Sequence, residues 1–224
     1  MIHLTQAKII TGFQEEALKA ARLRHGLRRA DRFTVMAVAA VAMAFPDGFP
    51  AFSNPDTGLV TCSSFGPHKT SFDTIDDILD YPEDQILPTR FSHSVHNAVT
   101  SYLGSVLKIK GPSFAVTNFE NPVYEALNLA DTLLSTGMCE NLLLVAVEER
   151  GLLTVTAAKD FPKRFPQEPA EAAAVFLASG NPAETSFSVT LEPASGEHDA
   201  GNPFQLPSDF ISHINSHQNT RLYR

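Results

Sequence analysis

His93 and His96 are the first side chains in this sequence whose types and spacing suggest chemistry. On a helix, residues three apart share one face, so two imidazoles there could act together as acid and base. A hydrogen-bonded interface histidine is the simpler interpretation, and both stay open. A zinc site needs at least a third protein ligand, and none stands at a suitable spacing, so no metal site is expected.

Cys62 and Cys139 are the two cysteines of the chain. They fall in different expected elements, and they have neither the spacing of metal ligands nor the density of a disulfide framework. Free cysteines usually behave as small hydrophobic residues. We therefore expect two reduced, buried thiols.

The formal net charge of −8 makes general nucleic-acid binding unexpected, because phosphate contacts need a concentrated excess of lysine and arginine. One local run of arginines is the exception, and it is either a solvated basic face or a receiving surface for an acidic partner. Its members are Arg22, Arg24, Arg28, Arg29 and Arg32.

The length of 224 residues suits one domain with a substantial core. No apolar run approaches the roughly 20 residues that a membrane helix needs. The apolar stretch 35–45 begins too far from Met1 for a signal peptide. The expected location is the cytoplasm, without membrane contact.

The elements that must position these residues alternate between strand and helix. Helices are expected from a cap at Asp31, from a cap at Ser71 to Pro82, over 92–103, and from Pro122 to a stop at Gly137. Strands are expected over 2–12, 58–65, 113–117, 141–147, 172–178 and 186–191. The order favours an α/β mixed sheet with an antiparallel portion, and the continuous apolar run 141–147 indicates a strand covered on both faces.

The composition turns polar after about residue 192. We expect a domain over 1–192 and a polar tail over 193–224, where Phe210, Ile211 and Ile214 could form one turn of a docking helix.

The segment 111–120, which reads GPSFAVTNFE and precedes the helix from Pro122, resembles the nucleophile strand and elbow of the β-ketoacyl synthases. Segments 28–34, 92–98 and 171–177 resemble other parts of that family's N-terminal half, in the same order. The resemblance implies a single thiolase-like half, with a mixed five-stranded sheet covered by helices.

In this family the elbow carries the active cysteine at a helix N-terminus, where the helix dipole stabilises a thiolate. Counted from Ser113, that position holds Glu120, and a carboxylate cannot form the acyl thioester of condensation. The two histidines of a full synthase come from its second half, which the resemblance does not cover. No catalytic residue and no cofactor are therefore expected.

Synthase-like proteins without the cysteine are similar to chain length factors, and the nearest are the half-length subunits of aryl polyene type II polyketide systems. The resemblance implies a heterodimer, or a dimer of heterodimers, with an active β-ketoacyl synthase subunit, and an acyl carrier protein reached through that complex. The expected interface strand pairs antiparallel with its counterpart and comprises Ser113, Phe114, Ala115, Val116, Thr117, Asn118 and Phe119.

The expected helix 92–103 and the residue before it would lie over the partner's acyl tunnel and set its depth. The alternative is that these side chains fill the chain's own core. The candidates are Phe91, Val95, Val99 and Tyr102.

Three other functions stay open at this point. Glu120 could support malonyl-thioester decarboxylation and so supply a primer, although an inert carboxylate that satisfies the elbow amides is the simpler role. The chain could be one half of a split synthase. It could also be an independent enzyme that uses Glu120 with His93 or His96 on an acyl thioester.

Overall fold

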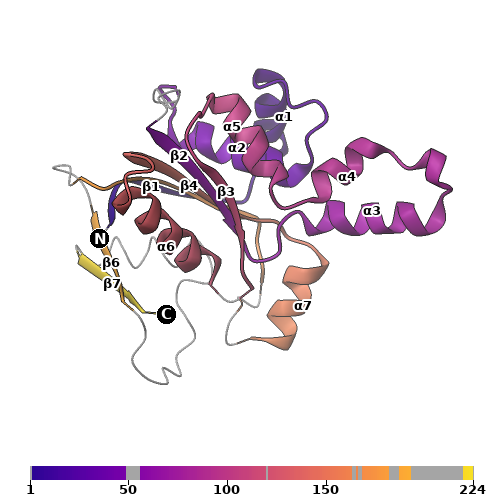
Figure 1. The fold of residues 1–224 in the computed structure, drawn as a ribbon. Helices are drawn as coiled ribbons and strands as arrows, with labels where there is room; N and C mark the ends of the chain where they lie inside the picture. The colour runs from indigo at the N-terminus through magenta and orange to yellow at the C-terminus, as the bar shows by residue number, and fades with distance from the viewer. Residues whose placement is uncertain are drawn as a thin grey trace.

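The computed structural model describes residues 2–48, 56–119, 121–162, 165, 168–181, 187–192 and 219–223. One mixed sheet of seven strands, in the order β3-β2-β4-β5-β1-β6-β7, runs through this part of the chain (Figure 1). The strands are β1 (Ile2–Thr11), β2 (Thr57–Ser63), β3 (Ser113–Thr117), β4 (Asn141–Glu148), β5 (Ala172–Ser179), β6 (Phe187–Glu192) and β7 (Asn219–Tyr223).

Helices cover both faces of the sheet. α2 and α5 pack on one face, with α1 against α2, and α6 packs on the other (Figure 1). The helices are α1 (Glu15–Arg24), α2 (Arg32–Ala44), α3 (His68–Asp80), α4 (Pro88–Ser94), α5 (Ala98–Leu107), α6 (Pro122–Ser135) and α7 (Leu152–Asp160), with a 3₁₀ turn η1 (Glu83–Gln85).

The strand directions confirm the expected mixed sheet. β3, β2 and β4 are parallel, whereas β5 is antiparallel to both β4 and β1. The expected count of five strands is wrong, because β6 extends the sheet beyond β1 and β7 pairs parallel with β6. The segment Asn219–Tyr223 is short and has no apolar alternation. It was therefore predicted to belong to the polar tail.

The core explains the continuous apolar pattern of β4. Alternate residues of this strand enter two hydrophobic clusters, with Val145 and Val147 on the α2 face and Leu144 and Ala146 on the α6 face. Both faces are thus covered by helices, as predicted.

Two of the expected helix boundaries are confirmed. Asp31 Oδ1 accepts a hydrogen bond of 3.1 Å from Thr34 N at the start of α2. Gly137 follows α6 with a φ of +70°, a conformation that glycine adopts without steric cost. The expected cap at Ser71 is wrong, because α3 already begins at His68, and Ser71 Oγ donates within the helix to the carbonyl oxygen of Pro67.

The single helix expected over 92–103 is also wrong, because the chain forms α4 and α5 with a break between them. Val95 has extended backbone angles, φ −88° and ψ 144°. The cause lies in packing, since α4 packs against α3 whereas α5 packs against α2 and β2. α1 and α7 were not predicted from the sequence.

The candidate docking turn at Phe210, Ile211 and Ile214 lies outside the described residues. Within the described ranges, no helix has the length and apolar character needed to cross a membrane.

Arg32 joins the start of α2 to the approach to β5. Its Nε and Nη2 donate to the two carboxylate oxygens of Glu171 at 2.7 and 2.8 Å, and its Nη1 donates to Glu15. The pKa of Arg32 is raised, chiefly by the hydrogen bond to Glu171. A bidentate arginine–carboxylate contact of this kind is stronger than an ordinary surface ion pair.

We expect Arg32→Met to lower the free energy of unfolding by about 1–2 kcal/mol, because the charge-assisted hydrogen bonds are lost while much of the side-chain packing remains. Urea denaturation measures the effect. The matched control is Arg28→Met at an exposed position, for which a change within about 0.5 kcal/mol is expected. Equal destabilisation by both variants would contradict a specific role for Arg32.

Candidate functional site

The candidate site lies where the three parallel strands end. Ser63 and Thr117 are register partners at the carboxyl ends of β2 and β3, and Glu148 ends β4. In open α/β sheets, this edge is where functional groups gather. The strand–turn–helix that the sequence predicted is present, because β3 leads through residues 118–121 into α6.

Hydrogen bonds hold the turn between β3 and α6. Asn118 N donates to the carbonyl oxygen of Ser63 at 3.3 Å, and Asn121 N donates to Asn118 Oδ1 at 3.0 Å. α6 then begins at Pro122, a residue whose fixed φ suits the first helical position. Glu120, the residue at the expected cysteine position, lies outside the described residues.

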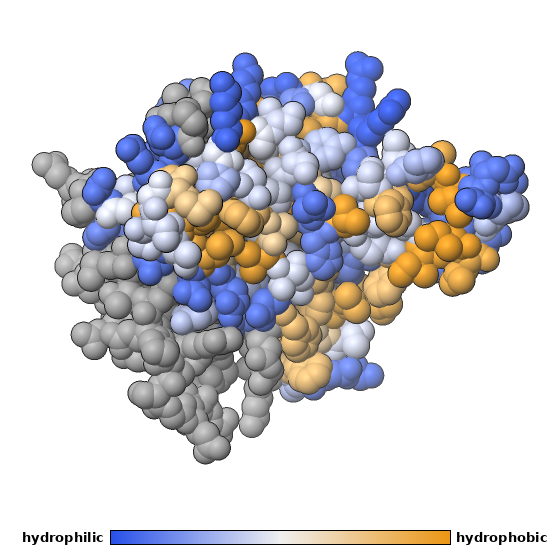
Figure 2. Space-filling model, in the orientation of Figure 1, coloured by the Kyte–Doolittle hydropathy of each residue, from blue (hydrophilic) through white to orange (hydrophobic). Residues whose placement is uncertain are grey.

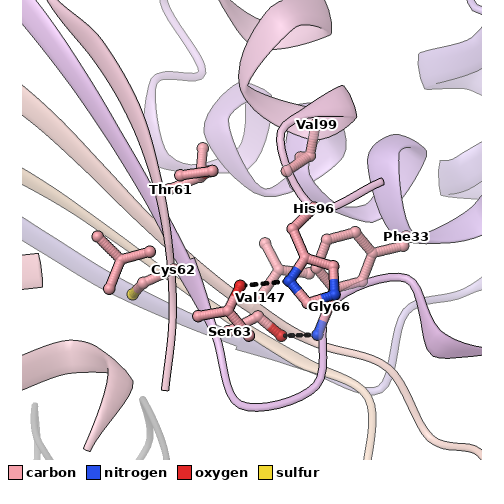
Figure 3. A pocket seen from close by; sticks show the side chains of 11 residues that line it. Phe33, Thr61, Cys62, Ser63, Gly66, His96, Val99 and Val147 are labelled. Atoms are coloured by element: carbon pink, nitrogen blue, oxygen red, sulfur yellow. Dashed lines mark hydrogen bonds between the residues drawn. The ribbon is translucent and has the colours of Figure 1, made fainter. Parts of the chain in front are cut away.

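A small cavity lies between β3, β2 and the start of α5 (Figure 3). Its volume is about 10 Å³, which is at most enough for one water molecule. Its lining includes Cys62, Ser63, Val99 and Thr117, and the His96 ring also borders it. This space does not accommodate an acyl chain.

Neither cysteine provides a ready thiolate. Burial raises the pKa of the Cys62 thiol, and the charge of Glu148 raises it further. Burial likewise raises the pKa of Cys139. Both thiols are free and buried, as predicted, and in such surroundings a cysteine is a poor nucleophile.

The two histidines do not form the pair that a shared helix face would give. His93 lies on α4 and its Nε2 hydrogen-bonds Tyr102 Oη at 2.8 Å, whereas His96 lies in the break after α4 and its Nδ1 bonds Thr117 Oγ1 at 2.6 Å. Burial lowers the pKa of His96. The break separates the side chains and gives each its own partner, so the expected common face is wrong.

Three phenylalanine rings surround Phe119, the residue before the expected cysteine position. The Phe119 ring lies 5.6 Å from Phe65, 5.5 Å from Phe161 and 5.2 Å from Phe165, measured between ring centroids. Such edge-to-face and tilted contacts favour a fixed arrangement. The sequence analysis missed this aromatic cluster, because its members come from three segments that are distant in the sequence.

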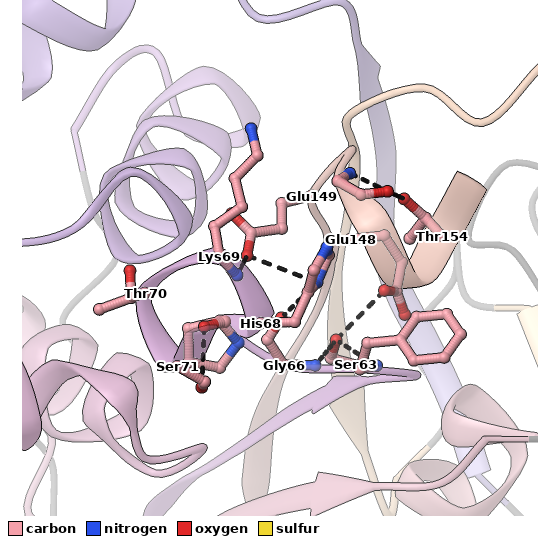
Figure 4. Close-up of polar contacts among 12 residues, drawn as sticks. Ser63, Gly66, His68, Lys69, Thr70, Ser71, Glu148, Glu149 and Thr154 are labelled. Atoms are coloured by element: carbon pink, nitrogen blue, oxygen red, sulfur yellow. Dashed lines mark hydrogen bonds and ion pairs between the residues drawn. The ribbon is translucent and has the colours of Figure 1, made fainter. Parts of the chain in front are cut away.

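The sequence analysis also missed a buried acidic pair, Glu148 and Glu149, behind the elbow (Figure 4). Glu148 accepts hydrogen bonds from Ser63 Oγ at 3.2 Å and from the backbone N of Ser64. Glu149 Oε1 accepts from Lys69 N at 2.9 Å in the first turn of α3, where a carboxylate complements the helix dipole. The only available signal was two adjacent glutamates directly after an apolar strand.

Burial raises the pKa of both carboxyl groups to about 7. The hydrogen bonds that each carboxylate accepts act in the opposite direction and lower its pKa. His68 Nδ1 lies 3.5 Å from Glu149 Oε1, and burial lowers the pKa of this histidine. Gly151 leaves room for the His68 ring, because a Cβ at position 151 would collide with His68 Nε2. The network therefore joins the ends of β2 and β4 to α3 in a tightly packed region.

The acidic pair predicts a pH dependence of stability. The folded protein keeps the Glu148 proton up to about pH 7, whereas the unfolded chain loses it near its ordinary pKa of 4.5. The stabilisation is thus complete below 4.5 and is lost as the pH rises through 7, amounting to roughly 1–3 kcal/mol for one group. Glu148→Gln should flatten this slope and be more stable than the wild type at alkaline pH.

Thermal unfolding between pH 5 and pH 8.5 checks this expectation, with the exposed Glu140→Gln as control. Parallel curves for the wild type and Glu148→Gln would show that the buried carboxyl does not cause the dependence.

No group of three or more His, Cys, Asp or Glu side chains in the described part of the chain is arranged to hold a metal ion. The side chains of the aromatic cluster and the acidic pair pack around the elbow and, among the described residues, leave only the small cavity between β2, β3 and α5. Strand β3, in contrast, lies at one edge of the described sheet.

Solved structures share this fold at low sequence identity. The ishigamide ketosynthase/chain length factor aligns with a TM-score of 0.62 at 17% identity, over 82% of this chain and 63% of that chain. A chain of the ketosynthase (ApeO) in complex with its chain length factor (ApeC) from Xenorhabdus doucetiae aligns with a TM-score of 0.58 at 20% identity, over 80% and 79%. A β-ketoacyl synthase from Burkholderia phymatum STM815 aligns with a TM-score of 0.56 at 14% identity, over 80% and 58%.

The chain therefore spans less than two thirds of the length of the first and third of these proteins. No curated protein sequence matches it. Residues 13–222, however, match the family model described as β-ketoacyl synthase, N-terminal domain. Together with the strand, turn and helix of the elbow, this match shows that the chain belongs to the β-ketoacyl synthase N-terminal domain family.

Proposed function

We propose that this chain is a noncatalytic, chain length factor-like subunit that pairs with an active β-ketoacyl synthase and helps shape its acyl tunnel. The observation that carries the proposal is the absence of a usable thiol: Glu120 occupies the cysteine position in the sequence, and both cysteines are buried with raised pKa values. Claisen condensation in this family needs a thiolate nucleophile. The similarity to ketosynthase/chain length factor structures supports the same role.

The proposed partner interface is the free edge of β3. This strand pairs with β2 on one side and ends the sheet on the other, among the described strands. Phe114 is 39% exposed on it, and an apolar edge strand without a partner is a site for unwanted association. Antiparallel pairing with the corresponding strand of a synthase subunit, over residues 113–119, would cover it.

The tunnel proposal rests on two of the four candidates. Phe91 on α4 is 60% exposed and Val95 after it is 38% exposed, so both are available to a partner. Val99 is only 3% exposed and belongs to the core, and the half-buried Tyr102 is held by its hydrogen bond to His93. The position of Val99 therefore supports the alternative that this side chain fills the chain's own core.

The finer proposals concern the pathway and the assembly. We propose a type II polyketide system of the aryl polyene kind, in which a carrier protein delivers acyl groups to the complex in the cytoplasm. The chain length factors named among the similar structures support this assignment at the level of fold.

We expect Phe114→Lys to abolish or strongly weaken the heterodimer, because a charge on the strand edge opposes pairing. The chain is co-expressed with candidate β-ketoacyl synthase subunits from the same organism, and size-exclusion chromatography with light scattering measures the complex. Leu23→Lys is the matched control, since Leu23 is 80% exposed on α1, away from β3. An intact heterodimer with Phe114→Lys would contradict the proposed interface, and condensation by this chain alone would contradict the noncatalytic role.

We expect Val95→Phe to shorten the acyl product of the reconstituted pair, because a larger side chain fills the tunnel. Val99→Phe should instead destabilise the chain by about 1–3 kcal/mol, because its site is already packed. Mass spectrometry of the carrier-bound product and thermal unfolding separate these effects. An unchanged product distribution with Val95→Phe in an intact complex would argue against tunnel lining.

A further inference from the structure

A cleft much larger than the cavity beside β3 borders the first turn of α3. Its walls come from the residues after β1, the turn after β4, helix α7 and the segment before β5. Its volume is about 760 Å³, within the range of about 300–1,000 Å³ that is typical of small-molecule sites. The cleft and the small cavity have no lining residue in common, so the cleft is separate from the elbow.

Two cationic side chains line the cleft. Lys69 lies in the first turn of α3, and Arg150 lies in the turn after β4. These two segments are in contact, because a Cβ added at Gly151 would lie only 3.2 Å from Lys69 Cγ. Figure 4 shows the Lys69 ammonium group pointing away from His68 and Glu148. Neighbouring like charges repel each other, and an anion that contacts both would offset the repulsion.

Neither cation is used in folding. Within the described ranges, the side chains of Lys69 and Arg150 form no ion pair and no hydrogen bond. Lys69 donates to Glu149 from its backbone N and not from its ammonium group. The Glu171 carboxylate also lines the cleft, but it is already bound by Arg32. Both cations therefore stay available to a ligand.

The rest of the lining is largely apolar, with one further carboxylate. Figure 2 shows apolar side chains over α7, and one of them, Val155, lines the cleft and is 47% exposed. Phe13 and Pro169 extend this apolar wall. Glu168 is exposed and forms no ion pair in the described part of the chain, so its carboxylate can accept a hydrogen bond from a hydroxyl or ammonium group. Apolar walls with a few polar groups that fix orientation are typical of binding sites.

We propose that this cleft is a binding site for a small organic anion. A carboxylate or phosphate group of the ligand contacts Lys69 and Arg150, and its apolar body lies against Phe13 and Val155. A hydroxyl or ammonium group at the other end of the ligand donates to Glu168. The inference goes beyond the proposed function, because it concerns this chain alone and needs no synthase subunit.

The test is an NMR titration of the ¹⁵N-labelled chain with phenyl phosphate, which joins an anionic group to an apolar ring. We expect a Kd of about 1 mM or lower, with the largest amide shifts at Gly12, Arg150 and Ala170 on the border of the cleft. Benzoate is the carboxylate counterpart, and the tighter of the two identifies the anionic group that the site prefers. Benzyl alcohol has no charge and should bind about 10-fold more weakly or not at all.

A double variant tests the two cations. Lys69→Gln/Arg150→Gln should weaken the binding of phenyl phosphate about 10-fold or more, because both charge-assisted contacts are lost. The matched control is Lys110→Gln/Arg24→Gln, which removes the same two residue types at exposed positions outside the cleft. The control should change the Kd less than about 2-fold. All four side chains are exposed, so the amide spectra should show the fold of the wild type.

A second pair of variants tests the cleft itself. Val155→Trp should fill it and weaken the binding of phenyl phosphate, whereas Thr156→Trp should not, since Thr156 is the next residue of α7 and does not line the cleft.

Three results would overturn the inference. They are the absence of binding at about 10 mM phenyl phosphate and benzoate, equal binding of benzyl alcohol, and equal binding by Lys69→Gln/Arg150→Gln and its control. Amide shifts centred on residues 22–32 would likewise assign the anion to the arginine run and not to the cleft. None of these results affects the proposed function, which is tested by association with a synthase subunit.

Discussion

The pairing of β3 along only one of its edges is the constraint on which the other features depend. Its parallel register with β2 places Thr117 beside Ser63, and thereby sets the position of the turn into α6. The other edge has no neighbouring strand in the described part of the chain. The same pairing thus positions the elbow and leaves Phe114 exposed. It also fixes the point at which His96, in the break after α4, is hydrogen-bonded to the sheet.

The region around the elbow has the architecture of a nucleophile site but is filled by packing. An enzyme of this type needs a thiolate that a substrate can reach, with space beside it. Here Cys62 is buried on β2, the cavity next to it has a volume of about 10 Å³, and Phe119 packs against three other aromatic rings. These contacts stabilise the fold without leaving room for an acyl group. The proposed role, in which the chain supports a partner's tunnel, requires no nucleophile at this position.

The sequence predicted the elements whose signals are local. The apolar runs of β2, β3, β4 and β5 and the amphipathic α6 follow from periodicity, and Asp31 and Gly137 mark helix ends because capping depends on adjacent residues. The single helix over 92–103 was wrong because the break at Val95 is imposed by packing of α4 on α3. Local spacing does not contain that information.

The site was predictable in outline and not in detail, for the same reason. The strand and turn before Pro122 carry a recognisable motif, whereas the aromatic cluster joins residues 65, 119, 161 and 165 from three separate segments. Glu148 and Glu149 follow the apolar run 141–147, and nothing in their spacing indicates that they are buried. In the structure, burial raises the pKa of both carboxyl groups. A contact between distant segments leaves no trace in the spacing of either segment.

Charge has different physical roles in the arginine run and in helix α3. In the arginine run, Arg22 donates to the carbonyl oxygen of Ala30 at 2.7 Å and Arg32 binds Glu171, so part of the basic charge is used in folding. Asp76 and Asp80 stand four residues apart on α3, an arrangement in which like charges destabilise a helix. Neither side chain forms an ion pair within the described residues, so folding alone does not offset this cost.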